Sequence, residues 1–187
     1  MNQNDPGQAS APSGRPLGHW VARLDAGLSR LNRWALVLLL AVMATLVAVN
    51  VFARYAANYS FPWVEELTRY MMIWLTFLGA GPALRIGGHI AVESLPNALP
   101  APAARMLRGA IAMVIAATLV IMAWLGWQYA DFAWEQESPV MNWSLGKIYL
   151  ALPIGSVLTL LHLFFVAPKW IRDGEWDKQA GVDPQAV

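Results

Sequence analysis

The sequence contains no cysteine, which excludes disulfides, thiolate metal sites and cysteine nucleophiles. Charged residues are scarce: they make up 13% of the chain, against about 25% in ordinary soluble domains. The sequence also lacks the GxSxG, HExxH, Walker and GxGxxG motifs of hydrolases, zinc proteases and nucleotide-binding proteins. We therefore expect no catalytic residue, no cofactor site and no metal site.

The amino-acid composition is dominated by apolar side chains. Hydrophobic residues make up 57% of the 187 residues, and ten residues are tryptophan. The net charge is only +1, so no strong overall field attracts nucleic acid. This composition predicts an integral membrane protein.

Four apolar segments predict an all-α protein with four transmembrane helices. Each is close to the roughly 20 residues that an α-helix needs to cross a bilayer. The segments cover about residues 34–53, 63–84, 109–130 and 148–167. We expect a membrane domain at 19–170, a disordered cytoplasmic tail at 1–18 and a second cytoplasmic tail at 171–187.

Basic residues predict the orientation, because cytoplasmic loops of membrane proteins are enriched in lysine and arginine. Ten basic residues flank the ends that would share a side with both termini, and only Arg54 and Lys147 fall in the opposite loops. Arg69, inside the second apolar segment, is left out of this comparison. Both termini are therefore predicted to be cytoplasmic.

Residues 19–33 have helical amphipathic spacing just before the first apolar segment. Trp20, Leu24, Leu28 and Leu31 share one face, and arginines lie elsewhere around it. This pattern is typical of a helix that lies in the membrane interface. The alternative is a cytoplasmic extension of the first transmembrane helix.

Three charged residues stand at the start of the second apolar segment. Glu65 and Arg69 are spaced i,i+4, and Glu66 and Arg69 are spaced i,i+3, so both pairs can meet on one helical face. One interpretation is a self-satisfied ion cluster at the outer membrane boundary. The other is a polar patch that docks a partner, and the small Gly79 and Gly81 would let another helix approach closely.

Histidine offers little for redox chemistry. His19 and His89 lie outside the apolar segments, and only His162 is inside one. A transmembrane haem commonly needs a facing pair of ligands, so His162 is interpreted as a polar contact between helices. A haem- or quinone-linked anchor, and a self-contained four-helix transporter using Glu65 or Glu66, remain alternatives.

The order of several motifs resembles a known family. "NVFARY" (50–55) leads to "PWVEELTRYMMIWLTFLGAGPALRIGGHIAVESL" (62–95), and "YLALPIGSVLTLLHL" lies in the fourth segment. Over about residues 20–170 the chain resembles the small permease subunit, DctQ type, of tripartite ATP-independent periplasmic (TRAP) transporters.

The resemblance implies a function and partners. Such a subunit lies in the bacterial or archaeal inner membrane and braces a large membrane subunit that carries the substrate and ion sites. A periplasmic binding protein delivers organic acid anions, such as C4-dicarboxylates. An ion gradient, usually of sodium, drives uptake without ATP.

Family position also implies where a partner interface would lie. Arg54, Glu65, Glu66 and Arg69 would be on the outer side, and Arg85 and His89 on the cytoplasmic side. The full set of candidate interface residues is Arg54, Trp63, Glu65, Glu66, Arg69, Trp74, Gly79, Gly81, Arg85 and His89.

Overall fold

The structure is a computed structural model that describes residues 16–85 and 99–174. Its helices are α1 (Pro16–Ala56), α2 (Pro62–Arg85), α4 (Ala101–Phe132), α5 (Leu145–Tyr149) and α6 (Ala151–Asp173). The described ranges contain no strand, only an isolated bridge between Glu137 and Ser144 in the loop before α5. The predicted all-α class is confirmed.

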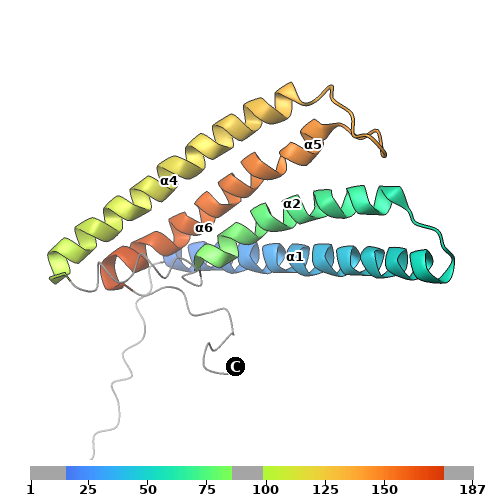
Figure 1. The fold of residues 1–187 in the computed structure, drawn as a ribbon. Coiled ribbons are helices and arrows are strands. Elements are labelled where there is room, and N and C mark those ends of the chain that lie inside the picture. The colour runs from blue at the N-terminus through green and yellow to red at the C-terminus, as the bar shows by residue number, and fades with distance from the viewer. Residues whose placement is uncertain (1–15, 86–98, 175–187) are drawn as a thin grey trace, which may run out of the picture.

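The four long helices lie side by side in one layer, in the order α1, α2, α6, α4 (Figure 1). α2 packs against both α1 and α6, and α6 packs against α4. In the described part of the chain, the two outer helices, α1 and α4, do not pack extensively against each other. The helices therefore form an open layer instead of a closed four-helix bundle.

Small residues let α6 pack closely in the middle of this layer. A β-carbon added at Gly155 of α6 would lie 2.5 Å from the β-carbon of Phe77 in α2. A β-carbon at Gly126 of α4 would lie 2.8 Å from Leu152 in α6. Because helix contacts in lipid depend on close van der Waals packing, these glycines allow α6 to be buried from both sides.

α1 meets α2 along a stripe with heptad-like spacing. The buried or half-buried positions of the stripe are Asn32, Leu36, Leu39, Met43, Leu46, Asn50 and Ala53. Alternating steps of four and three residues keep one face of a helix turned toward a single neighbour. Most side chains elsewhere on α1, including Trp34, Leu38 and Phe52, are exposed, as expected for a lipid-facing surface.

Within residues 16–85 and 99–174, three stretches are long and apolar enough to cross a membrane: 23–56 in α1, 101–132 in α4, and 145–173, which covers α5 and α6. α2 is not one of them. It has 24 residues, a length of about 36 Å at the usual helical rise. The fourth transmembrane helix thus remains a prediction.

Residues 19–33 form the first part of α1 and are continuous with its apolar part. A helix of 41 residues is about 60 Å long, twice the thickness of a hydrocarbon core of about 30 Å. This arrangement matches the alternative of an extended first helix, and a separate interfacial helix is not confirmed. α1 also begins at Pro16, inside the predicted 1–18 tail, while residues 1–15 and 175–187 lie outside the described residues.

Candidate functional site

Two groups of polar side chains occupy opposite ends of the helix layer. The hairpin cluster, around the α1–α2 turn, consists of Asn50, Arg54, Glu65, Glu66 and Tyr70. The His162 cluster, near the other end of α2, consists of Asp25, Asn32, Arg85 and His162.

Two asparagines shape the turn of the hairpin cluster: Asn50, in the last turns of α1, and Asn58, in the connection between α1 and α2. Asn50 is buried, and its Oδ1 accepts a hydrogen bond of 2.8 Å from the backbone N–H of Phe61. Asn58 has a φ of 50°, a left-handed conformation that asparagine tolerates better than most residues. These two residues let α1 end and α2 begin within a short connection.

Arg54 of α1 forms an ion pair with Glu65 of α2 across this turn. Arg54 also donates a hydrogen bond of 3.1 Å to the hydroxyl of Ser60. The side chains of Arg54 and Glu65 are about half exposed, at 49% and 56%. An exposed pair of this kind contributes only about 0–1 kcal/mol to stability, so its charges stay accessible to a partner.

Glu66 has a different role from Glu65, because it is buried. Its Oε1 accepts a hydrogen bond of 2.5 Å from the hydroxyl of Tyr70. Its Oε2 accepts two more, of 3.1 Å and 2.9 Å, from the backbone N–H groups of Val140 and Met141. Hydrogen bonds to an ionised carboxylate are among the stronger kinds, so Glu66 holds the loop before α5 against α2.

The predicted pairs of Glu65 and Glu66 with Arg69 are wrong. Across the described parts of the chain, Glu65 pairs with Arg54, Glu66 binds Tyr70 and the loop backbone, and Arg69 is exposed without an ion pair. The spacing within α2 permitted both pairs, but a neighbouring helix and a loop supply competing partners.

The His162 cluster joins α1, α2 and α6. His162 is fully buried, and its Nδ1 accepts a hydrogen bond of 2.7 Å from Nε of Arg85. Arg85 in turn forms a two-armed ion pair with Asp25 of α1. Asn32 donates a hydrogen bond of 3.0 Å to the carbonyl of Leu78, and its amide nitrogen lies 3.4 Å from Nε2 of His162.

Gly81 makes room for this cluster. A β-carbon at Gly81 would overlap the imidazole ring of His162. His162 therefore lies directly against the backbone of α2, and any larger residue at this position would displace the ring from Arg85. The prediction that His162 makes a polar contact between helices is confirmed.

Comparison with known proteins identifies the chain. Residues 43–168, more than half of the sequence, match the family described as tripartite ATP-independent periplasmic transporters, DctQ component. The chain belongs to the DctQ family. Members of this family are the small permease subunits of TRAP transporters, and the resemblance found in the sequence is confirmed.

Several relatives carry the same description. The chain is 28% identical to the ectoine TRAP transporter small permease protein TeaB of Halomonas elongata, over 80% of this chain and 78% of the relative. It is 31% identical to the C4-dicarboxylate small permease DctQ of Rhodobacter capsulatus, over 60% and 51%. It is 27% identical to DctQ of Vibrio cholerae, over 85% and 78%.

A DctQ-type subunit is a multi-pass protein of the inner membrane, which agrees with the apolar helices of this chain. The haem alternative is not favoured. Both ring nitrogens of His162 already lie against protein side chains, Arg85 on one side and Asn32 on the other. An axial ligand needs one of these nitrogens for iron.

The other predicted interface residues of this DctQ-type chain are spread along α2. Trp63 is 42% exposed, Trp74 is half-buried, and Gly79 faces Leu36 of α1, 3.9 Å from where its β-carbon would be. His89 lies outside the described residues. The structure thus brings Arg54 and Glu65 together, and brings Gly81 and Arg85 to His162, but it does not gather all ten residues at one site.

Sequence reasoning missed Asp25 and Asn32. Asp25 is the only acidic residue between residues 6 and 64, and a lone acid in a helix that precedes a membrane segment was a usable signal. Asn32 lies four residues before Leu36 and one heptad before Leu39 in the stripe that faces α2. Both residues are polar at positions where the pattern places a helix contact.

Proposed function

We propose that this DctQ-type chain is the bracing membrane subunit of a TRAP transporter and carries no substrate itself. It would support uptake of organic acid anions by a large membrane subunit, which a periplasmic binding protein supplies with substrate. Uptake would be driven by an ion gradient, usually of sodium, and not by ATP. The proposal also means that the chain is not an enzyme.

The open helix layer is the observation that carries this proposal. A transporter that works alone has to enclose a polar path for its substrate between helices. In the described residues, α1 and α4 form the two edges of one layer and do not pack extensively against each other. Such a layer presents broad apolar faces, on which another membrane protein or lipid can pack.

The polar groups of α2 support the same view. Glu66 and Arg85 are the buried charges of α2, and each is bound by neighbouring helices or loops of this chain. A transport site needs groups that can exchange partners with an ion or substrate. Because Glu66 and Arg85 are already bound within this chain, we infer that they stabilise a rigid support. This disfavours the alternative of a self-contained transporter.

We propose further that α2 is the fourth transmembrane helix and that both termini are cytoplasmic. The α1–α2 turn and the loop before α5 would then face the periplasm. The strong asymmetry of basic residues supports this orientation. The length of α2 is sufficient to cross a hydrocarbon core of about 30 Å.

The exposed half of the hairpin cluster is proposed as a partner interface. Arg54, Glu65 and Arg69 are exposed, and Trp63 lies beside them at the start of α2. Glu66 is turned inward to the loop, so its contribution to an interface would be indirect. The deeper predicted residues, Trp74 and Gly79, would act through packing within the layer.

The test is co-purification of the large membrane subunit with a tagged version of this chain. Glu65→Lys should reduce the recovered large subunit or the rate of uptake, because it reverses an exposed charge at the proposed contact. Glu135→Lys, at an exposed acid of the loop before α5, is the matched control. Unchanged recovery and uptake with Glu65→Lys would remove the interface from the proposal, and failure of the wild-type chain to recover any large subunit would overturn the proposed function.

A further inference from the structure

The exposed residues of α2 form a stripe along one face of the helix. All of them except Trp63 follow one another in steps of three or four residues. This α2 stripe consists of Pro62, Glu65, Arg69, Met72, Thr76, Ala80 and Ala83. Such steps keep one face of a helix turned toward a single neighbour. The α2 stripe therefore has the spacing of a contact between helices, although the described part of the chain leaves it uncovered.

The α2 stripe differs in chemistry from the exposed face of α6, the other inner helix of the layer. After Pro62, its members are charged, polar or small, and Met72 is the exception. The exposed residues of α6 between 151 and 167 are Ile154, Val157, Leu161 and Phe164, which are all large and apolar. Large apolar side chains suit lipid tails, whereas small and polar residues are typical of contacts between membrane helices. The α2 stripe therefore suits another helix better than it suits lipid.

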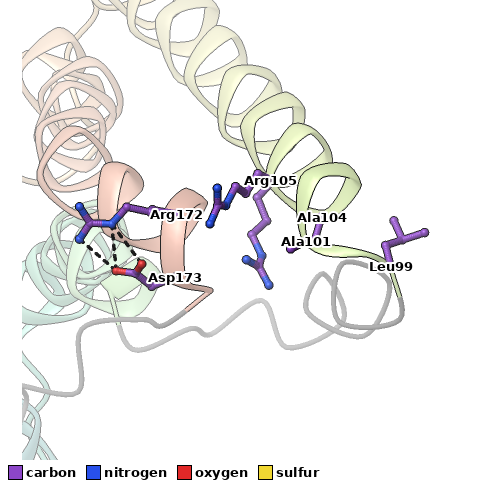
Figure 2. A pocket seen from close by; sticks show the side chains of 7 residues that line it. Leu99, Ala101, Ala104, Arg105, Arg172 and Asp173 are labelled. Carbon is purple, nitrogen blue, oxygen red and sulfur yellow. Dashed lines mark hydrogen bonds and ion pairs between the residues drawn. The ribbon is translucent and has the colours of Figure 1, made fainter.

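Arg69 carries the charge that lies deepest along the α2 stripe. It comes seven residues after Pro62, about 10 Å along the helix axis, and so inside the hydrocarbon core if α2 crosses the membrane. Its side chain is exposed and makes no ion pair in the described part of the chain. By contrast, Figure 2 shows Arg105 and Arg172 around a pocket where α4 begins and α6 ends, and there Arg172 donates hydrogen bonds of 3.1 Å to Asp173.

Bending of the Arg69 side chain toward the outer boundary would explain only part of the α2 stripe. Helical side chains point toward the N-terminus, so the guanidinium can reach toward water. The deeper positions Thr76, Ala80 and Ala83 would still present a small surface to lipid. The Thr76 hydroxyl donates to the carbonyl of Met72 at 2.9 Å, so Thr76 is compatible with a dry contact between helices.

We propose that a transmembrane helix of the large membrane subunit packs along the α2 stripe and places a carboxylate opposite Arg69. The small side chains of Ala80 and Ala83 let the two helices approach closely, and the carboxylate neutralises the guanidinium inside the membrane. This inference rests on the proposed function and extends the interface from the hairpin cluster into the membrane.

Charge decides between this occupant and two others. A lipid tail offers no partner for the guanidinium of Arg69. A second copy of this chain, packed on the same stripe by two-fold symmetry, would bring two Arg69 side chains to the same depth. A helix with an acidic residue at this depth satisfies the charge.

The first test compares two exposed alanines by co-purification of the large subunit with the tagged chain. Ala80→Leu should reduce the recovered large subunit about fivefold or more, because a large side chain separates closely packed helices. Ala117→Leu, at an exposed position of α4, is the matched control and should leave recovery unchanged. Thermal unfolding of the purified chain should be the same for both variants and wild type, since neither alanine is buried within it.

Arg69→Gln tests the charge in the same assay. It should also lower recovery, whereas Arg69→Lys, which keeps the charge, should retain more of the large subunit than Arg69→Gln. Recovery within about twofold of wild type for both Ala80→Leu and Arg69→Gln would overturn the α2 stripe as an interface. An equal loss with Ala117→Leu would overturn it too, because it would show a general effect of added bulk in the membrane.

Photo-crosslinking in membranes identifies the occupant. With p-benzoylphenylalanine in place of Thr76, ultraviolet light should give a product with the combined mass of this chain and the large subunit. The same group in place of Val157, on the exposed face of α6, should give little of this product. A product of two copies of this chain, or products with lipid alone, would overturn the proposal. If the wild-type chain recovers the large subunit and the α2 stripe fails these tests, the proposed function stands without this contact, whereas a wild-type chain that recovers no large subunit contradicts the function itself.

Discussion

At the scale of single residues, two adjacent glutamates at the start of α2 have different environments. Glu65 is exposed and pairs with Arg54, whereas Glu66 is buried and accepts hydrogen bonds from Tyr70 and the loop before α5. Their positions on the helix decide this difference, because neighbouring residues of a helix point in different directions. Glu66, which stands out in the sequence as a charge at the start of an apolar helix, therefore holds the loop before α5 in place.

Replacing Glu66 by alanine should loosen the loop before α5. The partly buried N–H groups of Val140 and Met141 lose their charged acceptor, and a hydrogen bond to a charged group contributes about 1.5–3 kcal/mol. Hydrogen–deuterium exchange of peptides covering residues 138–143 should become faster. Glu65→Ala is the control and should leave exchange in this loop unchanged. Equal exchange in wild type and Glu66→Ala would show that the carboxylate does not hold the loop.

Replacing Asp25 by asparagine should destabilise the chain. Arg85 would keep its charge in a largely buried position while losing its ion pair with the carboxylate of Asp25, since the Arg85 side chain is 11% exposed and that of Asp25 is 25% exposed. Breaking a fully buried pair costs about 3–5 kcal/mol, and partial exposure of Asp25 reduces the expected cost to about 1–3 kcal/mol. Thermal unfolding in detergent measures this change. Asp131→Asn, at an exposed position in α4, is the control, and a melting temperature equal to that of wild type for Asp25→Asn would contradict the role of the pair.

At the scale of helices, glycine positions decide how closely α2, α6 and α4 approach. Apolar runs predicted the membrane-crossing parts of α1, α4 and α6, because the energy of transferring a helix into lipid depends on local composition. The order of the helices in the layer could not be predicted in this way. It depends on contacts such as Gly155 with Phe77, between residues far apart in sequence.

Substitution of Gly155 by alanine should push α2 and α6 apart. The added β-carbon would lie 2.5 Å from Cβ of Phe77 and 2.8 Å from its carbonyl oxygen, and backbone atoms cannot easily move aside. Overpacking of this kind costs about 1–3 kcal/mol. Gly109→Ala in α4 is the control, because nothing lies within 4 Å of its added β-carbon, so it should be neutral or slightly stabilising. Gly155→Ala should therefore lower the melting temperature in detergent, whereas Gly109→Ala should leave it unchanged or raise it slightly. A Gly155→Ala chain with the melting temperature of wild type would show that this contact is loose.

The polar contacts show the same limit of sequence reasoning. Helical spacing alone offered Arg69 as the partner of both glutamates, yet Glu65 is bound by Arg54, from the preceding helix. Asp25 and Arg85 are 60 residues apart, and nothing local indicates their pairing. By contrast, the isolated His162 within an apolar segment was enough to predict a contact between helices, because a polar group in lipid needs a partner.

At the scale of the whole molecule, the absence of cysteine allows a direct test of topology. A single cysteine introduced at Ala57, in the α1–α2 turn, or at Ala101, at the start of α4, is the only thiol in the chain. If α2 crosses the membrane, a membrane-impermeant maleimide should label Ala57→Cys in intact cells stripped of their outer membrane. It should label Ala101→Cys only after lysis. Labelling of both from the same side would contradict the fourth transmembrane helix.

The open layer of helices and the membership of the DctQ family support the central proposal about the whole protein, which is that the chain braces a transporter and carries no substrate itself. Uptake into proteoliposomes tests this claim most directly. Vesicles are made with this chain alone, with the large membrane subunit alone, and with both, and all receive the binding protein, its organic acid ligand and a sodium gradient. We predict uptake only with both membrane subunits present, and sustained uptake by this chain alone would contradict the account.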